Sequence, residues 1–269
     1  HRFTPESVID FQSLIGSDVV IPLDQCVAYP CEKTDALEAL ERTTQWAKRS
    51  KERFEEQKGS DPQKTGGRPL LFGIVQGATY PDLRRQAVEQ IVPLTFDGYC
   101  LGGFSVGEPK DEMLRIMAHT PHRLPAHKPR YLMGVGTPED LVEGVAAGVD
   151  MFDCVMPTRN GRNGMLFTTE GIINIKNLKW KEDFSPVDSG IETVASQGFS
   201  KSYLRHLFIA GEILGLQIAS VQNLAFYLWL MRQARIAILE DRFESWSSEL
   251  LPRIDRRLSK GVDQALRTR

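Results

Sequence analysis

The sequence lacks three features that mark particular classes of protein: long apolar runs, paired cysteines and a large net charge. No stretch approaches the roughly 18 consecutive apolar residues of a membrane-spanning helix, and His1 begins no signal peptide. The four cysteines form no C-x-x-C pair, and three of them lie in or beside expected strands (Cys26, Cys31, Cys100 and Cys154). A formal net charge of −2 does not indicate a general nucleic-acid binder. A hydrophobic content of 41% allows a sizeable core, so we expect a cytoplasmic globular enzyme without a membrane segment.

The sequence also lacks a G-x-G-x-x-G motif after its first apolar run, which disfavours a dinucleotide-binding fold. What it has instead is a repeated alternation of short apolar runs with helical patterns. The runs lie at residues 17–24, 70–77, 98–104, 131–136 and 151–156, and the helical patterns at 34–47, 84–92, 110–119 and 139–147. In the first helical pattern, Asp35 with Glu38 resembles a capping box. Strands that alternate with helices predict a parallel sheet.

Five such units favour a (β/α)8 TIM barrel over an open doubly wound sheet. In a barrel, the polar and glycine residues at the strand ends would meet at one mouth, where barrel enzymes have their active sites. Only five strands are visible before residue 157, so we expect a barrel that lacks about three N-terminal βα units, roughly 100 residues. The residues expected at the mouth are Asp24, Gln76, Gly103, Met133 and Asp153.

The remainder of the chain does not continue the alternation. Residues 166–175 predict a hairpin around Glu170 and Gly171, and the pattern from residue 200 onward is helical. We therefore expect catalytic βα units over residues 1–164, a hairpin and helical C-terminal appendage over 165–258, and a tail over 259–269. The polar, glycine-containing segment 55–69 is expected to be a mobile loop.

The most informative segment is residues 151–164. Asp153 interrupts an apolar run, which is costly unless the carboxylate is paired or used. Pro157 and Gly161 predict a loop after it, and Arg159 and Arg162 in that loop suggest a substrate that carries phosphate. A buried Asp that accepts loop amides explains Asp153 equally well. The local basic stretch that continues through Lys176, Lys179 and Lys181 is also compatible with a solvated loop.

The order of several motifs resembles the tRNA-guanine transglycosylases. These enzymes exchange guanine at the wobble position of certain tRNAs for a 7-deazaguanine, in queuosine biosynthesis. Each motif is weak alone, but their joint order over more than 200 residues is specific. They are GSD at 16–18, LDQC at 23–26, FGIVQG at 72–77, FDGY at 96–99, GG at 102–103, VGE at 106–108, YLMGVG at 131–136, MFDCVMPTR at 151–159, RNG at 162–164 and GEILG at 211–215.

The resemblance implies a role for each matching position. Asp153 stands where the family has the nucleophile that forms a covalent glycosyl–enzyme intermediate. The base would be held by Asp24, Gln76 and the Gly103 backbone, between apolar walls formed by Phe104 and Met133, with Cys26 and Gly134 nearby. The wobble base must leave its stack to reach such a pocket. The implied RNA contacts are Gly134, Val135, Gly136, Thr137, Pro138, Glu139, Asp140, Thr158, Arg159, Asn160, Gly161 and Arg162.

Two departures from the family pattern are visible. The family's general acid/base, in an Asp-Ser-Gly-Gly motif, is not in this sequence. The family's three zinc cysteines and one zinc histidine are replaced by Ile191, Thr193, Ser196 and Gln222. Because none of these is a thiolate or an imidazole, no zinc cofactor is expected.

The implied partners are a tRNA with guanine at the wobble position and a 7-deazaguanine base. The residues around Cys26 resemble the bacterial pattern, which favours preQ1 over queuine. Whether the chain forms a homodimer stays open, because the family's zinc region takes part in dimer contacts. The alternative function is a non-catalytic tRNA-binding or subunit-like relative. Retention of Asp153, Asp24 and Gln76 favours the enzyme.

Overall fold

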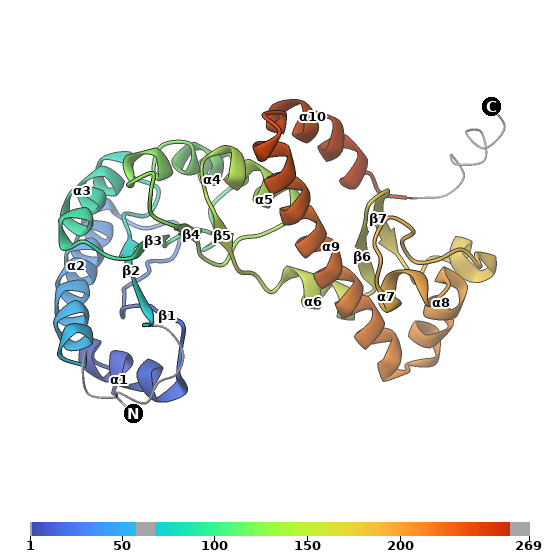
Figure 1. Cartoon of the computed structure of the whole chain (residues 1–269), viewed down its shortest axis with the longest axis horizontal. Helices are drawn as coiled ribbons and strands as arrows, with labels where there is room; N and C mark the ends of the chain where they lie inside the picture. The colour runs from blue at the N-terminus through green and yellow to red at the C-terminus, as the bar shows by residue number, and fades with distance from the viewer. Residues whose placement is uncertain (1, 58–67, 259–269) are drawn as a thin grey trace. The chain divides into compact units, whose positions relative to one another are not determined.

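A computed structural model describes residues 2–57 and 68–258 of the chain (Figure 1). The chain divides into two compact units, and each is described by itself. Unit 1 comprises residues 1–135 and 143–153, and unit 2 comprises residues 136–142 and 154–269. Most of the segment 55–69 and all of the tail 259–269 lie outside the described residues. The domain boundaries expected at residues 164 and 258 remain a prediction.

Unit 1 contains a curled, five-stranded parallel sheet whose strands follow the chain in the order β1-β2-β3-β4-β5. The strands are β1 (Val19–Val20), β2 (Leu70–Val75), β3 (Gly98–Leu101), β4 (Arg130–Leu132) and β5 (Met151–Phe152). Helices separate them: α2 (Lys33–Glu56), α3 (Pro81–Ile91), α4 (Lys110–Met117) and α5 (Pro138–Ala146), with short 3-10 turns at Val92–Leu94 and Pro121–Arg123. The predicted α/β alternation is confirmed. It puts the carboxyl ends of all five strands at one edge of the sheet.

The two faces of this sheet carry different apolar clusters, because side chains alternate along a strand. In Figure 1, helices α2 and α3 lie side by side along one side of the sheet. Strand residues such as Leu71, Val75 and Leu101 join the core that includes these helices. The intervening residues form a second cluster, which we call the inner cluster: Phe72, Ile74 and Cys100, with Val19, Ile21, Tyr131 and Met133 packed against it.

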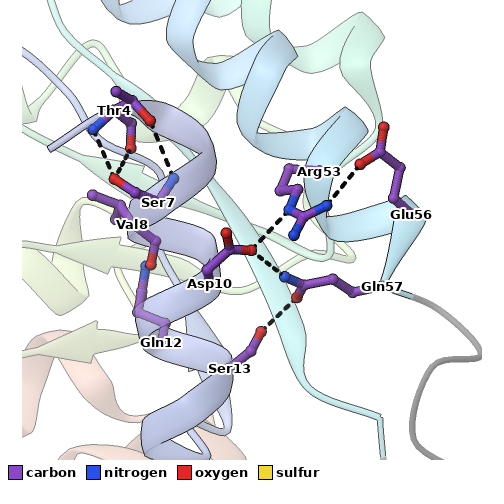
Figure 2. A network of polar contacts seen from close by, with 9 residues as sticks. All are labelled: Thr4, Ser7, Val8, Asp10, Gln12, Ser13, Arg53, Glu56 and Gln57. Carbon is purple, nitrogen blue, oxygen red and sulfur yellow. Dashed lines mark hydrogen bonds and ion pairs between the residues drawn. The ribbon is translucent and has the colours of Figure 1, made fainter.

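A helix not predicted from the sequence, α1 (Pro5–Ile15), precedes the sheet. Thr4 and Ser7 cap its start reciprocally, and Gly16 ends it in the left-handed conformation at φ 78°. Figure 2 shows how it docks on α2: the Asp10 carboxylate accepts hydrogen bonds from Arg53 Nε at 2.8 Å and from Gln57 Nε2 at 2.6 Å. Polar contacts therefore fix this helix to its neighbour, together with Ile9, which is fully buried in the core that also includes Phe54 of α2.

Unit 2 consists of helices around a two-stranded hairpin. The predicted hairpin is confirmed, with β6 (Met165–Thr168) antiparallel to β7 (Gly171–Asn174). The helices are α6 (Met156–Arg162), α7 (Val194–Gln197), α8 (Lys201–Ala210), α9 (Ile213–Leu239) and α10 (Phe243–Ile254), with a 3-10 turn at Leu178–Glu182. Their shared core contains Leu166, Ile173, Trp180, Leu204 and Ile218.

Three local predictions were wrong. The segment after Asp153 is not a loop, because residues 156–162 form α6. Pro157 lies in the first turn of that helix, where proline is tolerated because its missing N–H would have no helical partner. Asp35 and Glu38 form no capping box; the helix begins two residues before Asp35, after Glu32, without a side-chain cap. The strands at 17–24 and 151–156 are also shorter than expected, with two residues each.

Among the described residues, α9 is long and apolar enough to cross a membrane by length and composition alone. It nevertheless contains Gln222 and Asn223, both fully buried. Asn223 donates to the carbonyls of Pro157 and Met165 and accepts from Phe167 N, each at 2.9 Å. These bonds give the middle of α9 the packing of a core helix in unit 2.

Candidate active site

The ends of β1, β2 and β3 bring together the residues expected to read the base. Gln76 follows β2 directly, and its Nε2 donates to Asp24 Oδ2 at 2.6 Å. Gln76 is only 3% exposed, so this amide has a fixed position. Burial raises the pKa of Asp24 above its ordinary value, while the hydrogen bond from Gln76 opposes the rise. The predicted pairing of two strand ends at one polar site is therefore present in unit 1.

The backbone after β3 lies directly against the Gln76 side chain. A Cβ atom added to Gly102 would come within 2.6 Å of Gln76 Nε2, and one added to Gly103 within 2.6 Å of Gln76 Oε1. Gly103 also has φ 69°, a conformation that favours glycine. Only glycines can therefore bring this backbone so close to the amide.

Asp153, which follows β5, is exposed and held by two hydrogen bonds. Tyr131 Oη donates to its Oδ1 at 2.6 Å, and Gly134 N donates to the same oxygen at 2.8 Å. Burial and the Asp153 carboxylate both raise the pKa of Tyr131, so the phenol stays protonated and keeps donating. No hydrogen bond within the described part of the chain is directed to Oδ2. The carboxylate is thus oriented through one of its two oxygens.

The carboxylates of Asp24 and Asp153 both influence the pKa of the Cys100 thiol in the inner cluster. Burial raises the pKa of Cys100, and the Asp24 and Asp153 carboxylates raise it further. Met133 packs against this cluster as well. Both carboxylates are therefore close enough to the inner cluster to influence this thiol electrostatically.

The other residues expected around the base differ in their surroundings. Cys26 is exposed as a residue, but loss of hydration around its sulfur and the Asp24 carboxylate raise the pKa of its thiol, and the Arg84 guanidinium opposes the rise. Phe104 is 5% exposed and belongs to the core on the helix side of the sheet, whereas Met133 lies at the inner cluster. The two apolar walls expected around the base stay a prediction.

The residues expected to contact RNA are divided between the units. Gly134 and Val135 belong to unit 1, and the others belong to unit 2. Thr137 and Asp140 form a capping box at the start of α5, with Thr137 N to Asp140 Oδ2 at 2.8 Å. Asp140 is 8% exposed, so its observed contacts are structural.

Within α6, only part of the expected RNA-contacting segment is accessible. Arg159 and Arg162 are exposed, whereas Gly161 is buried. A Cβ on Gly161 would lie 2.9 Å from the backbone of Ala219 in α9, so this glycine allows the two helices to pack closely. The helix presents two arginines while its glycine faces the core.

The positions that carry zinc ligands in the family do not fit a metal here. Thr193 and Ser196 hydroxyls bond to each other at 2.6 Å, Ile191 is a buried aliphatic side chain, and Gln222 Nε2 donates to Phe167 O at 3.1 Å. Across residues 2–57 and 68–258, no group of three or more His, Cys, Asp and Glu side chains could hold a metal ion. The donor set lacks the thiolates and imidazoles that zinc prefers.

A buried carboxylate is the centre of polar contacts in this region. Asp188 accepts from Thr169 N at 2.8 Å, Thr169 Oγ1 at 2.7 Å and Gly190 N at 2.9 Å. Gln222 Nε2 of α9 lies 3.5 Å from Asp188 Oδ2. We call these residues the Asp188 network. It joins the hairpin loop to the segment before α7 and reaches α9.

Four residues that sequence reasoning did not assign prove central: Tyr131, Arg84, Asp188 and Asn223. Tyr131 is in a recognised motif, but its contact with Asp153 depends on the register between β4 and β5. Asp188 and Asn223 bind segments far away along the chain. Of the four, only Asn223 stands beside a long apolar stretch, residues 224–230, that hinted at its burial.

Comparison with known proteins places this geometry in a family. The family model described as "TGT: Queuine tRNA-ribosyltransferase" matches residues 1–256. A queuine tRNA-ribosyltransferase of Mannheimia succiniciproducens is 49% identical over 253 residues, which is 94% of this chain and 65% of the relative. A queuine tRNA-ribosyltransferase of Aquifex aeolicus is 48% identical over 262 residues, which is 96% of this chain and 66% of the relative. The chain spans about two thirds of the length of these relatives. It belongs to the queuine tRNA-ribosyltransferase family.

Proposed function

We propose that the protein exchanges guanine at the tRNA wobble position for a 7-deazaguanine, as a pentosyltransferase of queuosine biosynthesis. The observation that supports this most directly is the orientation of Asp153 by Tyr131 and Gly134 through one carboxylate oxygen. Its other oxygen would attack C1′ of the target nucleotide and form a covalent intermediate, as in retaining glycosidases. Attack of the incoming base on C1′ would then release the enzyme.

Base recognition falls to the residues gathered at the ends of β1 to β3. The Asp24 carboxylate would accept hydrogen bonds from the ring N–H groups of the base. Gln76 and the Gly103 backbone would bind its carbonyl and amide edge, with Cys26, Phe104, Met133 and Gly134 around it. The contact of Gln76 with Asp24 supports this, because it fixes an acceptor beside a donor. Within this proposal we favour preQ1 over queuine because of Cys26.

RNA binding would use the segment 134–140 and the residues 158–162. The two exposed arginines of α6, Arg159 and Arg162, suit phosphate oxygens, which arginine binds in a bidentate manner. A wobble base flipped out of its stack would enter the site beside Asp153.

The finer fold is part of the proposal. We infer a (β/α)8 barrel to which this chain contributes five strands, followed by a helical C-terminal appendage. The open edge at β1 supports further strands there, since unpaired strand edges are usually covered. Exposed apolar residues on the neighbouring α1 point the same way, with Leu14 84% and Ile15 79% exposed. The general acid/base would come from those further units.

No zinc is expected, and the Asp188 network would hold its region together instead. Whether two copies associate as a homodimer stays open for the same reason. We infer a cytoplasmic protein without a membrane anchor, because its substrate is tRNA.

The test is base exchange by the full-length protein. Radiolabelled guanine should enter a wobble-guanine tRNA, and denaturing gels should show a covalent RNA–protein adduct. A non-catalytic tRNA-binding relative would bind the same tRNA but give neither result. The retained nucleophile argues against that alternative.

A further inference from the structure

Arg84 is a buried cation in the wall of the candidate base site. It lies in the first half of α3 and is only 2% exposed. None of the ion pairs among the described residues involves Arg84. Burying an unpaired charge is costly, so a fold retains one only where its hydrogen bonds or its charge are needed.

The guanidinium of Arg84 binds four backbone carbonyls, at the end of β2 and in the turns that follow β2 and β3. Nε donates to Ala78 O at 2.8 Å, and Nη1 donates to Val75 O at 3.2 Å. Nη1 also donates to Gly102 O at 2.6 Å, and Nη2 donates to Gly103 O at 3.1 Å. Four of the five N–H groups of an arginine are thereby used. These turns also contain Gln76 and Gly103, the expected contacts of the base carbonyl.

The contact with Gly102 O has an electronic consequence. A carbonyl oxygen bonded to a cation draws electron density from its own peptide group, so the N–H on the other side becomes a stronger donor. In the Gly102–Gly103 peptide, that N–H belongs to Gly103. This peptide lies directly against the Gln76 side chain, which in turn binds Asp24, so it forms part of the wall of the candidate base site.

The guanidinium also keeps its charge under ordinary conditions. Burial lowers the pKa of Arg84 to about 10, which still leaves the group protonated near neutral pH. The ring of Phe104 lies 4.5 Å from its central carbon and covers it as a cation–π contact. A fixed positive charge is therefore present behind the Gly103 turn.

We propose that Arg84 is a positioning residue that stabilises the departing base anion by polarising the Gly102–Gly103 peptide. This inference rests on the proposed function. When the C1′–N9 bond breaks, its electron pair leaves with the base, and an Asp153 oxygen bonds to C1′. Part of the negative charge reaches the base carbonyl oxygen, and the base then takes a proton from water. Hydrogen-bond donors that already point at the position where negative charge develops accelerate such a step, because they need not reorient during the reaction.

The test uses single-turnover formation of the covalent adduct by full-length protein on a wobble-guanine RNA. Arg84→Met removes the charge with little change in volume. The adduct rate constant should fall roughly tenfold to hundredfold, while base affinity and adduct amplitude stay nearly unchanged. Misfolding would instead lower the amplitude. Arg84→Lys, which keeps a charge, should recover part of the rate.

The matched control is Arg115→Met. Arg115 also donates to a carbonyl of the turn after β2, that of Thr79 at 3.0 Å, but it is exposed and pairs with Glu112. The adduct rate constant of Arg115→Met should equal that of the wild type. An RNA with 8-azaguanine as the target base gives a second readout, because its anion is more stable and needs less help. The effect of Arg84→Met should shrink on that RNA.

Three outcomes would overturn the inference. They are equal rates for Arg84→Met and wild type, equal rates for the Met and Lys variants, or an effect of the same size on both bases. If the wild type itself forms no adduct, the proposed function is wrong and the inference is lost with it.

Discussion

The two units of this chain differ in how far their residues match the pattern of the family. In unit 1 the residues expected to act on the base are retained and tied to one another: Gln76 binds Asp24, and Tyr131 binds Asp153. In unit 2 the positions of the zinc ligands hold side chains that cannot bind zinc. The contrast teaches that the proposed reactive site keeps the family's donor types, whereas the positions of the family's structural metal centre hold other interactions.

The rebuilding is visible in the kinds of contacts that unit 2 uses. A tetrahedral zinc would join four side chains at one point. Here a buried carboxylate accepts two backbone N–H groups and one hydroxyl instead, and Gln222 reaches toward it from α9. Phe199 and Tyr203 stack with ring centroids 6.0 Å apart on the adjoining segment. Many modest interactions would thus stabilise a region that a metal stabilises elsewhere.

The largest effect should come from Asp153, the proposed nucleophile in unit 1. Asp153→Asn in the full-length protein should lower base exchange on the order of 10⁴-fold and abolish the covalent adduct, because an amide cannot attack C1′. Adduct formation on denaturing gels is the measurement. Asp150→Asn is the matched control: Asp150 is exposed, and its carboxylate accepts a hydrogen bond from Arg130 N at the start of β4. An adduct that persists in Asp153→Asn would show that Asp153 is not the nucleophile.

The next effect is on the stability of unit 2. Asp188→Ala leaves two backbone N–H groups and a hydroxyl without their acceptor, so we expect unfolding to become easier by about 3 kcal/mol. The melting temperature should fall by roughly 6–12 °C. Calorimetry would measure it, with the exposed Glu249→Ala of unit 2 as control. A variant that melts with the wild type would show that the Asp188 network does not hold the unit.

The two units also differ in how much of their structure the sequence predicts. The apolar runs predicted the order of the five strands, because a buried parallel strand needs apolar side chains on both faces. They did not predict strand length: β1 and β5 pair over only two residues each, which depends on the neighbouring strand. The site at the strand ends followed from the same parallel order.

What the sequence could not predict depends on distant partners. Gly161 resembles a helix breaker, yet α6 forms because α9, some 58 residues away, packs on the space that the glycine leaves. Arg84 resembles an ordinary exposed helix residue, and its burial depends on two turns after different strands. The Asp188 network likewise joins residues 169, 188 and 222.

A smaller effect should separate recognition of the base from bond cleavage. Asp24→Ala should weaken binding of the free base by about 2 kcal/mol, roughly thirtyfold, because a hydrogen-bond acceptor for the ring N–H groups is lost. Titration calorimetry on the full-length protein would measure the affinity. Gln76→Glu is a useful companion, since a second carboxylate beside Asp24 should weaken binding through repulsion. Unchanged affinity in Asp24→Ala would exclude Asp24 from the base site.

The same carboxyl gives this prediction a pH dependence. Only ionised Asp24 accepts from both ring N–H groups, and burial raises its pKa above the ordinary value. As pH falls, wild-type base affinity should therefore begin to drop at a higher pH than an ordinary aspartate would allow. Asp24→Ala should lack this dependence. A wild-type affinity that stays flat down to the usual range of carboxyl groups would contradict it.

The last prediction is that removal of zinc has no effect on stability. It tests the contrast between the two units most directly. If the Asp188 network replaces the metal, purified full-length protein should contain substoichiometric zinc, and a chelator should leave its melting temperature unchanged. The reason is chemical: Ile191, Thr193, Ser196 and Gln222 offer zinc neither a thiolate nor an imidazole. Substitution by the family's ligands, Ile191→Cys, Thr193→Cys, Ser196→Cys and Gln222→His together, provides the positive control. That variant should bind zinc and lose stability with chelator, because metal binding would then contribute to folding. One tightly bound zinc per wild-type chain, with chelator-sensitive melting, would mean that ligands outside these four positions hold the metal. The two units would then both retain the family's centres, and the contrast between them would disappear.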